Sequence, residues 1–194
     1  MFNLIKDQLV ECKDSKDIPK EIGLYFVFKK SLEELNTPVY IGSATGKTGL
    51  YGRIHSQHLN PNYLETRISK SNTKDKFQIS CQMTKKNRND EYVSCIDKSS
   101  LRKAIGRAHE IPPGDATVEY INENYKIFYL PLVKSDFEFK LDGTLKNFVD
   151  SFIESDSVVG ASLMREVSKG MTLSIENVLI KEFQPVYNTQ ENHS

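Results

Sequence analysis

Two short apolar runs, residues 23–28 and 38–42, set the hydrophobic pattern of the first part of the chain. Side chains alternate between the faces of a strand, so Tyr25 and Tyr40 lie opposite their apolar neighbours. If the two runs pair as one hairpin, with their apolar faces together, both tyrosines lie on the far side. The polar connection between the runs contains Asn36 and predicts a loop. The apolar face of the first strand carries Ile22, Leu24, Phe26 and Phe28, and that of the second carries Val39 and Ile41.

Helical periodicity and one further apolar run complete the expected fold. Residues 125–133 predict a third, central strand, and a proline near its end limits its length. The fold class is therefore α/β of the α+β type, a small three-stranded antiparallel sheet flanked by helices, in a single domain over residues 1–194. Spacing of apolar residues predicts helices at 2–12, from 48 or 49 through 58, at 101–109, at 145–153, at 157–169 ending at Gly170, and from 174 to 184. Ser99-Ser100 is expected to cap the helix at 101–109.

The segment at about 60–110 is expected to be an insertion into this domain, and it is basic. Residues 66–107 hold 11 Lys and Arg against 4 Asp and Glu, although the whole chain has a net charge of zero. A local basic patch favours binding of a polyanion such as DNA, and the alternative is a solvated loop. The pattern predicts a hairpin of 77–81 with 91–96 around a polar turn at 85–90. The candidate DNA-binding residues are Lys85, Lys86, Arg88, Arg102, Lys103 and Arg107.

Several classes of protein are disfavoured by the sequence. The three cysteines, at positions 12, 81 and 95, are odd in number and widely spaced, so neither a disulfide framework nor a zinc site is indicated. No apolar run approaches the length of a membrane span and no signal peptide is evident, so we expect a cytoplasmic protein without a membrane partner. Residues 43–48 look like a phosphate-binding loop, but only three residues separate Gly42 from Gly46 where four are needed. No nucleotide cofactor is therefore expected.

The tyrosine motifs, together with three later residues, point to a family. Gly23-Leu24-Tyr25 is followed by Tyr40-Ile41-Gly42, then by Arg53 on an expected helix, Glu176 on a later helix, and Asn188 after a proline. This order and spacing resembles the GIY-YIG nuclease family. The resemblance covers about half of the chain. It implies a metal-dependent endonuclease that hydrolyses phosphodiester bonds in DNA, with Mg²⁺ or Mn²⁺ as its cofactor.

The resemblance also implies a role for each matched residue. Tyr25 would lie near the metal-bound water and act as general base, Tyr40 would orient the site, and Arg53 would bind a phosphate oxygen. Glu176 would hold the metal. Gly23, Gly42 and Asn188 would be structural, with Asn188 tying the C-terminal segment to the sheet. The family often places a histidine or tyrosine four residues after the arginine. Here that position is Gln57, so the role falls to His58 through a local shift, to His55, or to Gln57 itself.

The position of Glu176 has an argument of its own. On a helix of 100° per residue, Glu176 falls within the arc occupied by Ile175, Leu179 and Phe183. A carboxylate on an apolar face needs a partner or a metal, because burying it alone is unfavourable. Two observations weaken this argument. Glu182 lies in the same arc, and the first turn of a helix favours a glutamate in any case.

The subfamily is expected from size and exclusion. The chain resembles a stand-alone restriction-type or mobile-element endonuclease, because it lacks extra repair domains. A catalytically silent DNA-binding module of the same fold is an alternative, and so is a DNA-repair or mobile-element nicking nuclease. Cleavage of both strands of a duplex would favour a homodimer.

Overall fold

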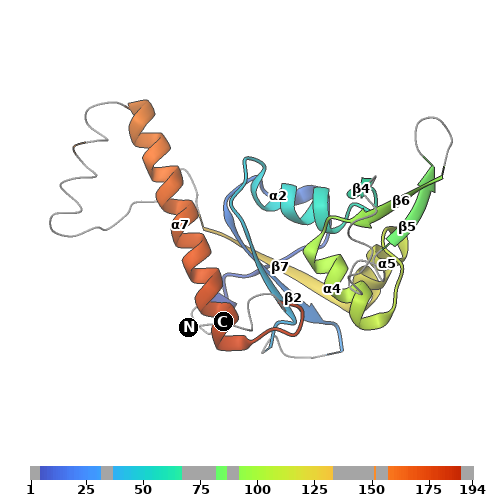
Figure 1. The fold of residues 1–194 in the computed structure, drawn as a ribbon. Coiled ribbons are helices and arrows are strands. Elements are labelled where there is room, and N and C mark those ends of the chain that lie inside the picture. The colour runs from blue at the N-terminus through green and yellow to red at the C-terminus, as the bar shows by residue number, and fades with distance from the viewer. Residues whose placement is uncertain are drawn as a thin grey trace.

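A computed structural model describes residues 5–31, 37–66, 82–86, 92–132, 151 and 157–188. Its main feature is a four-stranded antiparallel sheet with strand order β1-β7-β2-β3 (Figure 1). The predicted mixed architecture of an antiparallel sheet with helices is confirmed. The sheet has one strand more than expected, because residues 10–11 pair with β7 rather than continuing a helix. The strands are β1 (Val10–Glu11), β2 (Gly23–Lys29), β3 (Tyr40–Ala44) and β7 (Tyr125–Pro131).

Both faces of this sheet are buried, by different helices. One face carries Leu24, Phe26, Phe28 and Ile41, which pack with Leu179 and Ile180. The other face carries Tyr25 and Tyr40 and packs with residues of the helices between β3 and β7. The predicted alternation in the first strand is confirmed. Val39 differs from expectation, since it precedes β3 and packs on the tyrosine face rather than with Ile41.

Gly42 and Gly23 lie where two parts of the sheet approach too closely for a side chain. In the β2–β3 register Tyr25 is opposite Gly42, and a Cβ on Gly42 would come within 2.2 Å of the Tyr25 oxygen. A Cβ on Gly23 would lie 2.3 Å from the Leu130 carbonyl oxygen. Glycine is therefore required at both positions by backbone and ring contacts.

The insertion forms a second antiparallel sheet, in the order β4-β6-β5. The expected hairpin is present, but its first strand lies at 82–86, so Lys85 and Lys86 belong to a strand and not to a turn. Residues 77–81 and Arg88 lie outside the described residues. The strands are β4 (Leu64–Thr66), β5 (Gln82–Lys86) and β6 (Tyr92–Asp97).

Two helices connect the insertion to β7. Helix α4 (Ser100–His109) begins after Ser99, whose Oγ accepts a hydrogen bond from the Arg102 N–H, as the sequence predicts for this cap. It ends at Glu110, which has a left-handed conformation with φ of 55°. Helix α5 (Asp115–Asn124) was not expected from the sequence. Its Thr117 and Ile121 are buried against the sheet and α4.

A long C-terminal helix, α7 (Ser157–Phe183), crosses the sheet and extends beyond it (Figure 1). The sequence predicts two helices here with a break at Gly170, and that prediction is wrong. Gly170 has no positive φ and lies in open space, so it continues the helix at only the modest cost of its low propensity. The expected helix at 145–153 lies outside the described residues except for Ser151. None of the helices in the described part of the chain combines the length and apolar character needed to cross a membrane.

The helix after β3 is short and irregular. It begins as α2 (Gly49–Arg53) and continues as a π-helical turn, η2 (Ile54–His58). The Leu59 N–H donates to the Ile54 carbonyl at 2.8 Å, which is the five-residue hydrogen bond of a π-turn. Such turns are frequent at functional sites.

Candidate active site

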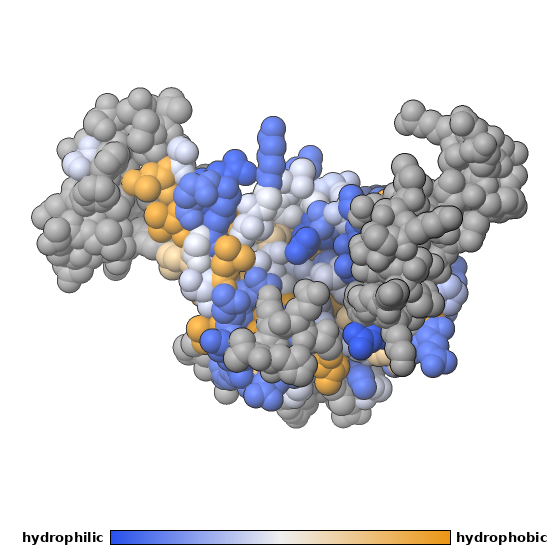
Figure 2. Space-filling view, viewed as in Figure 1, coloured by the Kyte–Doolittle hydropathy of each residue, from blue (hydrophilic) through white to orange (hydrophobic). Residues whose placement is uncertain are grey.

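A cleft of about 480 Å³ lies beside the edge strand β3. Its walls come from β3, the following loop, α2, α4, α7 and the segment after α7. Figure 2 shows apolar surface gathered along α7 and mostly polar surface over the middle of the molecule. The polar side chains that line the cleft include those of Tyr40, Arg53, Gln57, Lys103, Glu176 and Asn188.

The two motif tyrosines lie together at the bottom of this site. Their ring centroids are 6.0 Å apart, with an angle of 30° between the planes. Tyr40 borders the cleft, whereas Tyr25 is completely buried behind it. Burial raises the pKa of both phenols, and the nearby charge of Arg53 opposes that shift in each case. Both side chains are therefore neutral phenols at neutral pH unless more positive charge enters the site.

Arg53 connects the tyrosines with Glu176. Its Nη1 donates to Gln57 Oε1 at 2.9 Å, and its buried Nε has no hydrogen-bond partner among the described residues. Burial opposes its charge, but interactions with Tyr25, Tyr40 and Glu176 raise its pKa above the usual value. Arg53 is therefore a fixed cation at the wall of the cleft.

The π-turn determines which residue after Arg53 reaches the tyrosines. A wider turn brings a residue five positions later back towards the starting face of the helix. Accordingly, His58 Nε2 lies 2.7 Å from the Tyr25 oxygen, and its ring also contacts Tyr40 edge-on. Gln57 instead bonds to Arg53. His55 stacks on Tyr51 and hydrogen bonds to Ser15, away from the tyrosines. Of the three candidates, His58 is the one in contact with Tyr25.

Glu176 and Glu182, which the helical pattern could not separate, differ in the structure. Glu176 is half-buried and is the one carboxylate among the described residues that line the cleft. Glu182 is exposed at the last turn of α7. No cluster of three or more His, Cys, Asp or Glu suited to a metal occurs in the described residues. One carboxylate in a polar cleft fits Mg²⁺, which keeps most of its water ligands, and does not fit zinc.

Asn188 holds the chain after α7 against the edge of β3. The Ile41 N–H donates to Asn188 Oδ1 at 2.9 Å, and Asn188 Nδ2 donates to the Ile41 carbonyl at 2.7 Å. The preceding residue, Tyr187, donates its N–H to the Val39 carbonyl. These bonds satisfy backbone groups of an edge strand, which is the tethering contact expected of Asn188.

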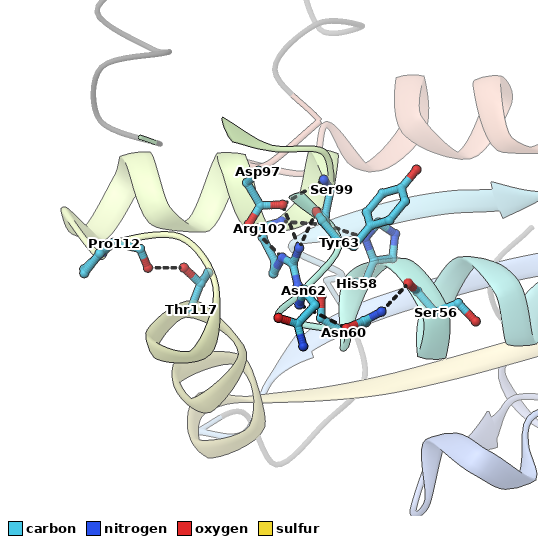
Figure 3. Close-up of polar contacts among 10 residues, drawn as sticks. All are labelled: Ser56, His58, Asn60, Asn62, Tyr63, Asp97, Ser99, Arg102, Pro112 and Thr117. Carbon is cyan, nitrogen blue, oxygen red and sulfur yellow. Dashed lines mark hydrogen bonds and ion pairs between the residues drawn. The ribbon is translucent and has the colours of Figure 1, made fainter. Parts of the chain in front are cut away.

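Arg102 does not belong to a DNA-binding surface, contrary to the sequence prediction. It is only 1% exposed, and it forms an ion pair with Asp97 with an Nε–Oδ2 distance of 2.8 Å. It also donates to the carbonyls of Asn60 and Tyr63 (Figure 3). Its guanidinium is thus committed to joining the insertion to the chain after η2, and a phosphate has no access to it.

The other candidate DNA-binding residues have varied positions. Lys103 lines the cleft, and Arg107, one turn further along α4, is exposed. Lys85 and Lys86 lie on β5, in the second sheet. Arg88 falls outside the described residues. Among the candidates whose side chains the structure describes, Lys103 is the one at the cleft itself.

The sequence analysis missed two side chains that touch the site. Ser99 Oγ lies 2.7 Å from His58 Nδ1, and Ser100 Oγ lies 2.8 Å from the Tyr40 oxygen. Both were recognised only as the beginning of a helix. The pattern of a double serine before a helix carried no further signal, because the partners are about 40 and 60 residues away in the chain.

Comparison of the chain with models of known protein families, with curated proteins and with solved structures finds no match. The function of this protein is therefore inferred from the residues of the cleft and their geometry.

Proposed function

We propose that this protein is a divalent-metal-dependent endonuclease that hydrolyses phosphodiester bonds in DNA, with a site of the GIY-YIG type. The observation that carries this proposal is the convergence of five side chains from separate elements. They come from β2, β3, α2, η2 and α7. Tyr40, Arg53 and Glu176 line one cleft. Tyr25 and His58 are buried against the ring of Tyr40.

These groups match the requirements of phosphodiester hydrolysis. The reaction needs a water nucleophile, a base to take its proton, and positive charge on the phosphate oxygens. Arg53 is a permanent cation at the cleft wall and would bind a phosphate oxygen. Lys103, which also lines the cleft, would bind a neighbouring phosphate. Together they orient a polyanion across the cleft.

Glu176 is proposed as the protein ligand of the metal. When bound, Mg²⁺ or Mn²⁺ supplies charge stabilisation at the phosphate and a more acidic water. The contribution of the chain is to place one carboxylate in the same cleft as Arg53. Arg53 and Glu176 line the same cleft, and Glu176 is among the groups that raise the pKa of Arg53.

Tyr25 is proposed as the general base, with Tyr40 as the group that orients it. Burial holds the pKa of Tyr25 well above 10, so deprotonation needs nearby positive charge and a hydrogen-bond partner. Arg53 supplies the charge, and His58 supplies the partner at 2.7 Å. Because Tyr40 borders the cleft and Tyr25 lies behind it, Tyr40 is the second candidate for the base.

The first test is cleavage of plasmid DNA by the Glu176→Gln variant. This change keeps the size of the side chain but removes the charge that holds a cation. We expect cleavage in Mg²⁺ to fall by at least about 10²-fold, since metal-ion catalysis contributes several kcal/mol. DNA binding in EDTA should persist, and stability should stay level or rise.

Glu182→Gln is the matched control, because it makes the same change on the same helix at an exposed position. It should cut at the wild-type rate. Full cleavage by the Glu176 variant beside an inactive Glu182 variant would overturn the assignment. A wild-type protein that binds DNA but never cuts it, in Mg²⁺ or Mn²⁺, would identify a silent binding module.

A further inference from the structure

A buried series of hydrogen bonds runs from the insertion to Tyr25. Figure 3 shows its part from Arg102 and Asp97 through Ser99 to His58. Asp97 Oδ1 accepts from the Ser99 N–H and from Arg102 Nη2, both at 2.8 Å. Ser99 Oγ is 2.7 Å from His58 Nδ1, and His58 Nε2 is 2.7 Å from the Tyr25 oxygen. Each of these five side chains is at most 2% exposed. Water is therefore excluded from these groups, and each of their polar hydrogens needs an acceptor within the protein.

His58 is the member of this series whose hydrogen can lie on either of two atoms. Burial, and then the charges of Arg53 and Arg102, hold the pKa of His58 well below 6.5, so the ring is neutral. A neutral imidazole donates from one nitrogen and accepts at the other. The ring therefore either donates to Ser99 and accepts from Tyr25, or accepts from Ser99 and donates to Tyr25.

The hydrogen bonds of Ser99 distinguish the two arrangements. Its Oγ already accepts from the Arg102 N–H at 3.2 Å, as the helix cap. Its own hydroxyl hydrogen has one acceptor within reach among the described residues, which is His58 Nδ1. An unpaired buried hydroxyl is unfavourable, so this hydrogen belongs on the Ser99–His58 bond. Tyr40, whose ring centroid lies 6.0 Å from that of Tyr25, is the group to which Tyr25 would donate its own hydrogen.

We infer that Ser99 is a positioning residue, which fixes His58 as the tautomer protonated at Nε2, so that His58 donates a hydrogen bond to the Tyr25 oxygen. A donor aimed at a phenol oxygen favours the phenolate, since hydrogen bonding to a charged form stabilises it. The consequence for catalysis rests on the proposed function, in which the phenolate form of Tyr25 accepts the proton of the attacking water. The tautomer itself does not depend on that function.

Ser99 is itself held in place by hydrogen bonds to both its backbone and its side chain. Its backbone N–H is bound to Asp97 and its Oγ to the first turn of α4. Asp97 is in turn paired with Arg102, which is anchored to the carbonyls of Asn60 and Tyr63. The insertion thus supplies a rigid hydroxyl to the site as well as a basic surface.

The direct test is two-bond ¹H–¹⁵N correlation NMR of the full-length protein labelled with [¹⁵N]histidine, without DNA. The chain has four histidines, so the His58 signals are assigned as those lost in a His58→Gln variant. We expect a protonated Nε2 and an unprotonated Nδ1. A ring protonated at Nδ1 would overturn the inference without the need for any Ser99 variant to fold. Absence of DNA cleavage by the wild type would sink the proposed function and leave this measurement valid.

Substitutions at Ser99 then test its role in positioning. Ser99→Ala should leave a mixture of His58 tautomers and reduce kcat for cleavage by about tenfold to a hundredfold, with the Kd for DNA in EDTA unchanged. Ser99→Thr retains the hydroxyl and the cap and should restore both the spectrum and the rate. Ser100→Ala, which removes the partner of Tyr40, should leave the His58 signals unchanged. A single, unaltered His58 tautomer in Ser99→Ala would refute the inference.

Discussion

The two faces of strand β2 are equally buried and chemically opposite. Tyr25 and Phe26 are neighbours in the sequence, and both are 0% exposed. Phe26 packs among the side chains of Leu24, Phe28 and α7. Tyr25 belongs to a chain of polar groups that continues through His58.

The difference separates two kinds of packing within one small sheet. Apolar packing is non-directional and tolerates changes that keep volume. A buried polar chain has no such tolerance, because each donor and acceptor needs its own partner. We therefore expect substitutions on the Phe26 face to change stability and substitutions on the Tyr25 face to change activity.

The largest effect should come from Tyr25→Phe. Removing the phenolic oxygen removes the proposed base, and cleavage should fall by about 10²–10⁴-fold, the usual contribution of general base catalysis. The free energy of unfolding should fall by only about 1–3 kcal/mol, because His58 loses a partner. Cleavage of plasmid DNA measures the change in rate, and urea unfolding measures the change in the free energy of unfolding.

Two controls sharpen this prediction. Tyr40→Phe should retain more activity than Tyr25→Phe, and the reverse order would make Tyr40 the base. Phe26→Tyr makes the opposite one-atom change on the apolar face. It should destabilise the protein, since the added hydroxyl would meet an apolar cluster. The rate of DNA cleavage by the folded protein should not change.

The next effect concerns the apolar face alone. Phe26→Ala should lower the free energy of unfolding by about 3–5 kcal/mol, through lost burial and the cavity left against α7. Phe26→Leu should lose much less, because most of the volume remains. Activity measured well below the unfolding transition should be near normal in Phe26→Leu. A large loss of activity there, at unchanged stability, would contradict the separation of the two faces.

A smaller effect is expected from the basic side chains of α4. Replacing both Lys103 and Arg107 with alanine should weaken DNA binding in EDTA and reduce the slope of log K against log salt by about 2. The control is Lys30→Ala with Lys126→Ala, which removes two charges at a second cavity beside β1 and β7. An equal change of slope in both double variants would mean that α4 has no special role in binding.

The smallest predicted effect is the response of His58 to acid. Its pKa in the folded protein lies below 6.5, because it is buried and faces Arg53 and Arg102. Its other neighbours described above, the phenols of Tyr25 and Tyr40 and the hydroxyl of Ser99, carry no negative charge. A lowered pKa contributes stability above pH 6.5, which is lost as the pH falls, since the unfolded chain then binds the proton first. Urea midpoints between about pH 7.5 and about pH 5 should therefore fall less in His58→Gln than in His55→Gln. An equal fall of the urea midpoint in the two variants would show that His58 does not cause the loss of stability in acid.

Much of the fold follows from local pattern in the sequence. Alternation over 22–28 placed Phe26 and Tyr25 on opposite faces, and the serine before residue 100 located the start of α4. Such signals are readable because strand alternation and helix capping depend on residues a few positions apart. The same local logic failed at Gly170 and at 10–11. In the first case an exposed glycine was tolerated within a helix, and in the second pairing with β7 outweighed helical periodicity.

The arrangement of the candidate site was decided by tertiary structure. A list of residue types contained Tyr25, Arg53 and Glu176, but it could not choose among His55, Gln57 and His58. That choice was made by the π-turn η2 together with the contact of His58 with Tyr25, which lies 33 positions earlier in the chain. Burial likewise changed Arg102 from an expected DNA contact into the partner of Asp97. A sequence states which groups a chain possesses, but which of them meet depends on contacts between residues far apart in the chain.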